Sequence, residues 1–136
     1  MREVSVSRFV RATPTEVERA LTPANVVEYE GSFRVRDVTE VDDATLVTAG
    51  ASGLELTLRF ERREDGLRYE QEGTEGPFDH METEVSVAAE DEGSRVTARS
   101  TVSLGVPPAA LADRVAAWKR KGELKRALDA LAAALE

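Results

Sequence analysis

Few residues of this 136-residue chain belong to the types that most often carry out chemistry. The chain has no cysteine, and His80 is its only histidine. Without cysteine there is no thiolate nucleophile, no disulfide and no cysteine-ligated metal site. A zinc site would need several His or Cys ligands, so one histidine argues against it. We therefore expect no metal and no cofactor.

The surroundings of His80 indicate a surface position. His80 is in phase with Glu82 and Glu84 on the predicted solvent-facing side of a strand. Asp79 lies nearby, so these carboxylates could attract a cation. Hard cations need about six or more converging oxygens, however, whereas carboxylates spaced by two along one strand are typical of a solvated edge.

Other polar side chains share the phase of apolar strand faces. Four of them are candidates for an interior position: Tyr69, Gln71, Thr83 and Ser100. A buried polar group without a partner costs about 1–3 kcal/mol, so each needs a hydrogen bond. Two interpretations remain open. The four groups satisfy one another or lie at strand ends, or they orient the polar end of a ligand in an apolar pocket.

The N-terminal third contains a strand and two short helices. Residues 3–10 alternate as in a strand. Thr13, Pro14 and Glu16 then form a capping-box pattern that predicts a helix start. Thr22-Pro23 repeats this signal, and Gly31 predicts the end of the second helix.

The next seventy residues read as strands. Six stretches alternate between apolar and polar residues and are separated by turn residues: 32–41, 44–50, 54–64, 67–74, 80–90 and 95–104. One apolar and one polar face on each strand predicts an antiparallel sheet covered on one side only. Pro107-Pro108 then opens a helix that reaches nearly to Glu136.

This order predicts an α+β fold. A curved seven-stranded antiparallel sheet would grip the long C-terminal helix, with two short helices between the first and second strands. The last helix is the only element long enough to cover the sheet. A strongly curved sheet leaves space beneath such a helix, and that space is where we expect a cavity.

The C-terminal helix carries two apolar stripes. Leu111, Val115, Trp118 and Gly122 form one, and the other comprises Leu124, Leu128, Leu131 and Leu135. The stripes lie about 130° apart, so one straight helix cannot bury both against one sheet. Either the helix bends or breaks near Gly122, or the first stripe meets a loop, a ligand or another subunit. Five basic residues are predicted to form a solvated face: Lys119, Arg120, Lys121, Lys125 and Arg126. The alternative is that they capture an anionic headgroup or a membrane surface, although stable surface binding needs a denser basic cluster.

Composition excludes some partners. The net charge of −8 argues against nucleic acid, because phosphate binding needs concentrated positive charge. Arginine outnumbers lysine 15 to 3, and with the acidic excess this is similar to proteins of salt-loving or high-GC organisms. No apolar run approaches a membrane span, and the N-terminus lacks a signal-peptide pattern. We therefore expect a cytoplasmic protein without stable membrane insertion.

Two segments resemble the START-like (SRPBCC) superfamily, which has the helix-grip fold. The first is VSRFVRATPTEVERALT, with an Ala12-Thr13-Pro14 step and Val17 and Leu21 four residues apart; the second is ELKRALDALAAALE, a leucine-rich helix ending in Leu-Glu. The resemblance covers nearly the whole chain and implies a single domain over residues 1–136. It also implies a hydrophobic ligand in a cavity, since members include polyketide cyclase/dehydrase-like proteins and lipid carriers. It transfers no catalytic residue.

Three functional hypotheses follow. The first is binding or transport of a hydrophobic small molecule or lipid, for which we predict the following cavity residues: Leu56, Leu58, Tyr69, Gln71, Thr83, Val85, Ala98, Ser100, Leu111, Val115 and Trp118. The second is a cyclase, aromatase or dehydratase in the same cavity, with Tyr69 as proton donor and Gln71 or Ser100 orienting a carbonyl. The third is a protein-interaction module or homodimer that uses the stripe containing Trp118. A cavity under about 100 Å³ would contradict both ligand hypotheses, because ligand pockets are usually about 300 Å³ or larger.

Overall fold

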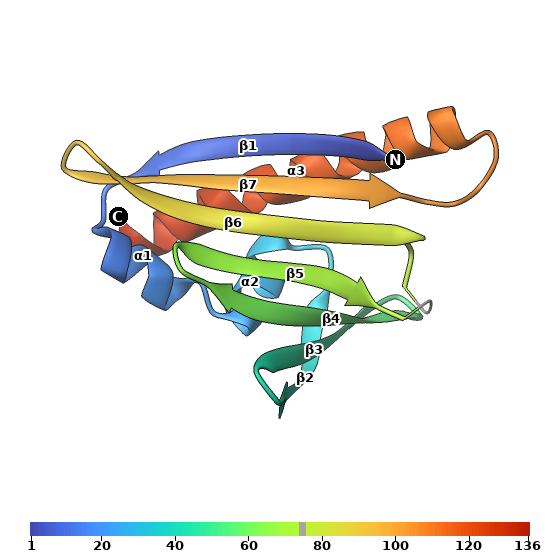
Figure 1. Ribbon diagram of the computed structural model, residues 1–136, viewed down its shortest axis with the longest axis horizontal. Coiled ribbons are helices and arrows are strands. Elements are labelled where there is room, and N and C mark those ends of the chain that lie inside the picture. Colours follow the sequence, from blue (N-terminus) through green and yellow to red (C-terminus); the bar gives the residue numbers. More distant parts are fainter. Residues whose placement is uncertain (74–75) are drawn as a thin grey trace.

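The computed structural model describes residues 1–73 and 76–136. Seven strands and three helices follow one another in the predicted order (Figure 1). Their bounds are β1 Arg2–Val10, α1 Pro14–Ala20, α2 Pro23–Glu30, β2 Arg34–Val41, β3 Ala44–Ala51, β4 Leu54–Arg63, β5 Gly66–Glu72, β6 His80–Glu90, β7 Gly93–Ser103 and α3 Ala109–Leu135. The predicted strand over 67–74 corresponds to β5, and its last residue, Thr74, lies outside the described residues.

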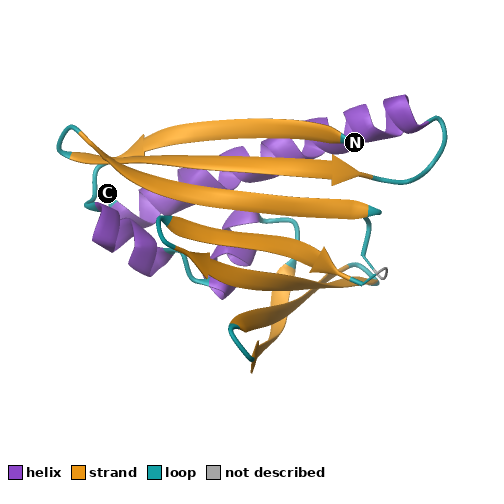
Figure 2. Cartoon of the chain, in the orientation of Figure 1, coloured by secondary structure: helices purple, strands orange, loops and turns teal. Residues whose placement is uncertain are grey.

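The sheet is antiparallel throughout and has the order β1-β7-β6-β5-β4-β3-β2. The three helices lie on one face of it (Figure 2). The predicted fold class is therefore confirmed. The register brings one row of inward-facing side chains into line across five strands: Phe60, Tyr69, Thr83, Ser100 and Val4.

The two short helices begin where the sequence predicts. Thr13 caps α1 by accepting a hydrogen bond from the backbone N–H of Glu16, and the Glu16 side chain accepts one in return from the Thr13 N–H. The Thr22 hydroxyl caps α2 by accepting a hydrogen bond from the backbone N–H of Asn25. Gly31 ends α2 with φ of +81°, a left-handed conformation that favours glycine. This termination fixes the direction of the preceding Glu30.

The long helix α3 differs from its prediction at Gly122. It is helical from Ala109 to Leu135 without interruption, so the predicted break is wrong. A close approach of another element does not explain the glycine either. A Cβ at this position would meet nothing nearer than Nη1 of Arg126, at 3.8 Å.

Of the two predicted apolar stripes, α3 buries the leucine stripe against the sheet and leaves the stripe containing Trp118 uncovered. Leu111, Val115 and Trp118 point to solvent, with 57%, 53% and 78% of their surface exposed. The first half of the helix buries polar and small residues instead, and these continue into the leucine stripe of the second half: Asp113, Ala116, Ala117, Arg120, Glu123, Leu124, Leu128 and Leu131. A straight helix can bury this face along its whole length, so it needs no bend.

The core lies between the sheet and the helices. α3 packs mainly on β1, β7 and α2, while α1 and α2 also contact the sheet. Buried apolar side chains from the sheet and from all three helices form one cluster that includes Val17, Val27, Phe60, Val96 and Leu131. Among the described residues, no helix is long and apolar enough to cross a membrane.

Candidate ligand-binding site

Arg120 is the centre of a buried polar cluster between α3 and the sheet. Its side chain is 2% exposed. Nη1 donates to Glu30 Oε1 at 2.6 Å and to Glu123 Oε1 at 3.2 Å. Nη2 donates to the Tyr69 hydroxyl at 2.6 Å. The prediction that Arg120 lies on a solvated face is therefore wrong.

The sheet supplies the remaining partners of Arg120. Its Nη2 also donates to Thr83 Oγ1 at 2.8 Å, and its Nε donates to Ser100 Oγ at 3.2 Å. The two hydroxyls are hydrogen-bonded to each other at 2.8 Å. All the donors of the guanidinium are thus occupied. Tyr69, Thr83 and Ser100 point inward, as their strand phase predicts, and they meet around an arginine that the sequence interpretation placed outside.

Two carboxylates balance the arginine. Glu30, at the end of α2, accepts hydrogen bonds from Arg120 and from the Tyr69 hydroxyl. Glu123, one turn along α3, accepts from Arg120 and from the Ser32 hydroxyl. With both carboxylates ionised, the cluster of one arginine and two glutamates carries a net charge of −1.

The cluster shifts the proton affinity of two groups. Burial raises the pKa of the Tyr69 phenol far above its ordinary value; the Arg120 guanidinium opposes this shift, and the Glu30 carboxylate adds to it. Burial is the largest single effect on Arg120 and by itself lowers the pKa of the guanidinium. The charges of Glu30, Tyr69 and Glu123, with the hydrogen bond to Glu30, together outweigh burial and raise this pKa well above its ordinary value. Tyr69 is therefore a neutral hydroxyl and Arg120 a permanent cation at neutral pH.

An apolar space adjoins the cluster. Glu30 and Tyr69 line part of it, and its other walls come from α1–α2, the sheet and the second half of α3: Leu21, Val26, Tyr29, Val85, Ala98, Leu124, Ala127, Leu128 and Leu131. Its free volume is about 10 Å³, less than a ligand needs. This volume lies below the limit of about 100 Å³, so the closed conformation contradicts binding of a ligand in an open, preformed cavity. The side chains of α2 and α3 fill the space.

The other predicted site residues lie elsewhere. Leu56 and Leu58 are buried in β4 but do not line the apolar space. The Gln71 amide is held by the backbone of Phe78, donating to its carbonyl at 2.6 Å. Leu111, Val115 and Trp118 do not line the space either, because they lie on the outer side of α3. Of the eleven predicted residues, Tyr69, Val85 and Ala98 line the space, and Thr83 and Ser100 contact Arg120 beside it.

Sequence reasoning missed the charged half of the site. Arg120 lies four residues after Ala116 and four before Leu124, so it continues the buried stripe of α3. Glu30 lies four residues after the buried Val26 on α2. In both helices, the spacing of four residues from a buried apolar residue indicated that the charged side chain faces inward. These signals were outweighed by the general expectation that charged side chains face water.

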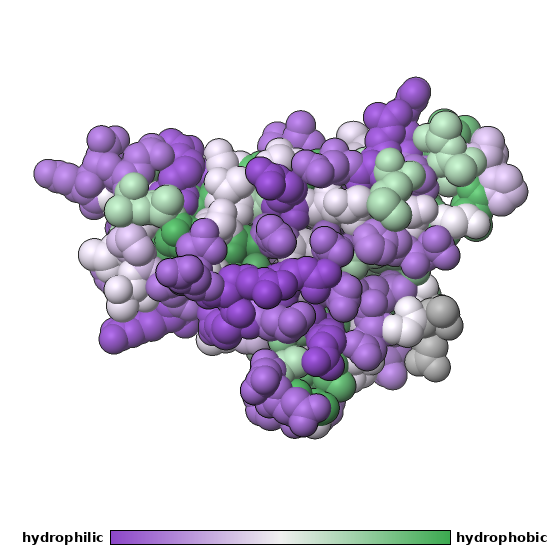
Figure 3. All heavy atoms as spheres, in the orientation of Figure 1, coloured by the Kyte–Doolittle hydropathy of each residue, from purple (hydrophilic) through white to green (hydrophobic). Residues whose placement is uncertain are grey.

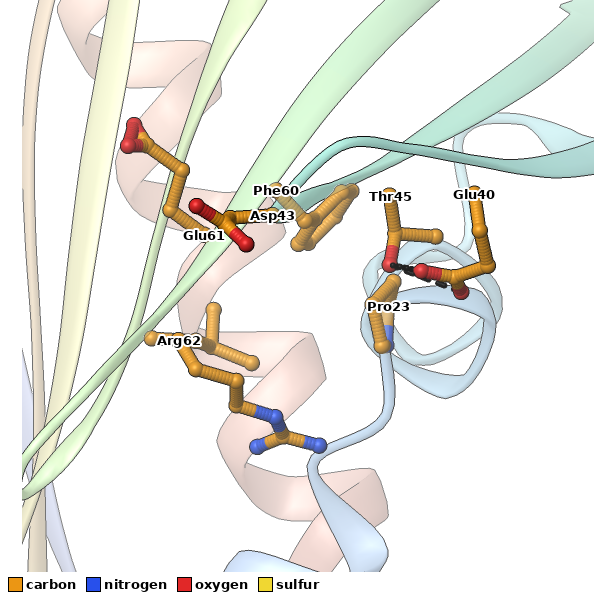
Figure 4. A pocket seen from close by; sticks show the side chains of 8 residues that line it. Pro23, Glu40, Asp43, Thr45, Phe60, Glu61 and Arg62 are labelled. Atoms are coloured by element: carbon orange, nitrogen blue, oxygen red, sulfur yellow. Dashed lines mark hydrogen bonds between the residues drawn. The ribbon is translucent and has the colours of Figure 1, made fainter.

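A second hollow of about 300 Å³ opens at the surface between α2 and the ends of β3–β5 (Figure 4). Phe60 and Leu67 form its apolar floor, and Phe60 stacks on Tyr69 with the ring centroids 4.5 Å apart. Charged residues surround it, and the Thr45 hydroxyl is bonded to Glu40 at 3.0 Å. Figure 4 shows no polar side chain that converges with others on its centre. Within residues 1–73 and 76–136, no group of three or more His, Asp or Glu side chains is placed to hold a metal ion.

Comparison with known proteins agrees with the geometry. Residues 1–136 match the family model described as polyketide cyclase / dehydrase and lipid transport. Similar structures include TTHA0849 from Thermus thermophilus, with 22% identity, 99% of this chain and 100% of that chain covered, and a TM-score of 0.71. XoxI from Bacillus cereus has 19% identity, coverage of 99% and 96%, and a TM-score of 0.73. A START superfamily protein from Mycobacterium smegmatis has 11% identity, coverage of 98% and 99%, and a TM-score of 0.71. No curated protein matches the sequence at a comparable significance.

Proposed function

Because the chain belongs to the polyketide cyclase/dehydrase and lipid transport family, we propose that residues 1–136 form one domain that binds a hydrophobic small molecule or lipid between the sheet and α3. The apolar part of the ligand would occupy the space lined by Val85, Ala98 and Leu128. Its polar end would meet the Arg120 cluster, which borders this space through Glu30 and Tyr69.

The observation that carries this proposal is the buried arginine. Removing ions from water is costly, and a buried ion pair stabilises a fold no better than well-packed apolar residues of similar size. Strongly shifted groups beside an apolar space are typical of functional sites. An arginine with two carboxylates, two hydroxyls and a phenol is therefore a set of donors and acceptors that a ligand headgroup can exchange into.

Binding requires the space to enlarge. The free volume of about 10 Å³ must grow to at least about 300 Å³, so α3 or α2 has to move outward. The first half of α3 faces the sheet with alanines and polar groups, which interlock less than large apolar side chains. Separation of this half exposes little apolar surface to water. It also breaks the hydrogen bonds that Arg120 donates to Thr83 and Ser100, so a ligand headgroup has to replace them.

The same geometry constrains the enzymatic alternative. The Tyr69 hydroxyl donates its proton to Glu30, and its raised pKa makes it a weak acid. A substrate carbonyl would have to displace the Glu30 carboxylate before Tyr69 could donate to it. Binding of a ligand does not require that Tyr69 exchange its hydrogen bond from Glu30 to the ligand. We therefore prefer ligand binding to the enzymatic alternative.

A fluorescent fatty acid such as cis-parinaric acid tests the proposal. Ala127→Leu adds bulk at the wall of the apolar space, whereas Ala133→Leu adds the same bulk on the exposed side of the same helix. We expect wild type and Ala133→Leu to bind one equivalent of the probe with similar affinity, and Ala127→Leu to bind at least about 10-fold more weakly, since lost apolar burial is worth about 1–3 kcal/mol. Equal affinities for all three proteins would contradict this site.

A further inference from the structure

The outer side of the first half of α3 carries an apolar strip that nothing in the described structure covers. Leu111, Val115 and Trp118 follow one another along it, and Val106 of the preceding loop is 52% exposed beside the helix start. Figure 1 shows the first turns of α3 projecting beyond the ends of the strands. In the space-filling view, apolar residues gather at this same end of the molecule (Figure 3). We call this strip and its flanking basic residues the α3 outer face.

In the first half of α3, the basic side chains other than Arg120 are exposed and the acidic side chains are buried. The cations at its surface are Arg114, Lys119, Lys121, Lys125 and Arg126, and all five are exposed. The only two carboxylates between residues 109 and 126 are Asp113 and Glu123, and both are buried. Asp113 accepts hydrogen bonds from the Leu104 N–H and from the amino group of Met1, and Glu123 accepts from Arg120. The exposed charges of this half are therefore all basic, although the chain carries −8 overall.

Helical geometry puts the basic residues on both sides of the apolar strip. At 100° per residue, Lys121 and Lys125 fall on one side of the line through Leu111 and Trp118, and Lys119 falls on the other. This is the arrangement of an interfacial helix, with an aromatic and aliphatic centre between flanking cations. A solvated helix back would carry charges of both signs without an apolar centre.

A shallow hollow lies over Gly122 within this face. It has a volume of about 470 Å³ and is walled by Trp118 and four cations: Lys119, Lys121, Lys125 and Arg126. Gly122 also lines the hollow, and a Cβ there would meet nothing nearer than Nη1 of Arg126, at 3.8 Å. An anionic headgroup placed in it would meet positive charge from both sides of the helix.

We propose that the α3 outer face docks reversibly on an anionic lipid bilayer. Trp118, Leu111 and Val115 enter the interface between headgroups and acyl chains, while the flanking lysines contact anionic headgroups, one of them in the hollow over Gly122. We choose a bilayer as the partner because cations flank the apolar strip on one convex helix. Such a helix matches a bilayer surface, in which anionic headgroups lie over apolar acyl chains. The proposal concerns a surface, and it holds whatever the interior ligand is.

Trp118 provides the readout, since it is the only tryptophan and is 78% exposed. Vesicles of phosphatidylcholine with about one-third phosphatidylglycerol are titrated into the full chain at 0.1 M salt. We expect a blue shift of the tryptophan emission and co-sedimentation of the protein with these vesicles. Both signals should be absent with pure phosphatidylcholine, and they should fall steeply at 0.5 M salt, because salt screens the attraction.

Two charge-reversed variants separate the position of charge from its amount. The first is Lys119→Glu with Lys121→Glu and Lys125→Glu. The second reverses three exposed arginines outside the α3 outer face, Arg11, Arg34 and Arg63, and so has the same net charge. With each basic residue contributing about fivefold to membrane affinity, we expect the α3 variant to bind at least about 100-fold more weakly and the control to stay within about fivefold of wild type. Circular dichroism checks that both variants are folded.

Three results would overturn the proposal. One is an equal loss of vesicle binding in both variants, which would mean that only net charge matters. Another is vesicle binding without a blue shift of Trp118, which would place the contact elsewhere. The third is no vesicle binding by wild type together with self-association that the α3 variant abolishes, which would assign the face to a second copy of the chain.

Discussion

At the scale of single residues, Arg120 connects the helices to the sheet. It joins α2, α3 and three strands through hydrogen bonds to Glu30, Glu123, Tyr69, Thr83 and Ser100. These contacts are coupled because they share one guanidinium. Removing the cation leaves carboxylates buried without a counter-charge, which costs more than the intact pair contributes.

Arg120→Met should therefore lower the free energy of unfolding by about 3–5 kcal/mol. Adding Glu30→Gln to this variant should recover part of the loss, because the amide carries no charge that needs the guanidinium. Urea denaturation of wild type, both single variants and the double variant gives the coupling energy, which we expect to be at least 1 kcal/mol. Strictly additive effects would show that the two side chains do not depend on each other. Arg63→Met, at an exposed position, is the control and should stay within about 0.5 kcal/mol of wild type.

Tyr69 predicts a dependence of stability on alkaline pH. Its pKa is raised in the folded state, so the folded protein keeps the phenolic proton while the unfolded chain loses it near pH 10, at about the ordinary tyrosine pKa. The stabilising contribution of this group is complete below about pH 10 and declines as the pH rises further. Tyr69→Phe should be less stable than wild type by about 1–3 kcal/mol at pH 8. The difference should shrink above pH 10 by up to about 1.4 kcal/mol per pH unit.

Urea denaturation of both proteins between pH 8 and pH 11 measures this difference. A constant difference over the whole range would contradict the raised pKa of Tyr69.

The sequence predicts the polar residues of the strands well, because alternation along a strand fixes which side chains point inward. It does not predict their partner, since a charged residue in a helix is expected to be solvated unless its contacts are known.

At the scale of elements, α3 is the helix whose interpretation changed most. Two apolar stripes competed for burial in the sequence, and α3 buries the leucine stripe, which Arg120 continues, while the stripe containing Trp118 stays exposed. Helical periodicity identifies which residues share a face, but it does not identify which face meets the sheet when two faces compete. The strands and the two N-terminal helices presented no such competition, so their positions follow from alternation and capping residues.

Gly122 gives a prediction that belongs to this element. It lies inside an unbroken helix, and a Cβ there has open space around it. Gly122→Ala should therefore raise the free energy of unfolding by up to about 1 kcal/mol, because alanine favours the helix. Gly31→Ala is the matched control, since Gly31 has φ of +81° and alanine there should lower stability by about 1–2 kcal/mol. Thermal denaturation distinguishes the two changes by sign, and destabilisation by Gly122→Ala would show that α3 needs flexibility at this position.

At the scale of the whole molecule, one helix presents two different surfaces. Its inner side faces the sheet through the Arg120 cluster and the apolar space, and its outer side is apolar and basic. The proposed functions of the two sides fit together, because outward movement of α3 would be favoured where its outer face is held by a bilayer. The sequence predicts the architecture that creates these sides, whereas the closed volume of the space depends on side-chain packing that periodicity does not describe.

The most direct test of the central claim is the position of a bound ligand. A fatty acid with a diazirine in its acyl chain is bound to the protein without vesicles, activated by light, and located by tandem mass spectrometry of the peptides. The account predicts labels on the walls of the apolar space, in α2 near Tyr29, in α3 between Leu124 and Leu131, and on the strands at Val85 or Ala98. Two results would contradict the account. In one, the labels are confined to the outer side of α3 around Trp118. In the other, an excess of unmodified fatty acid removes none of the labels.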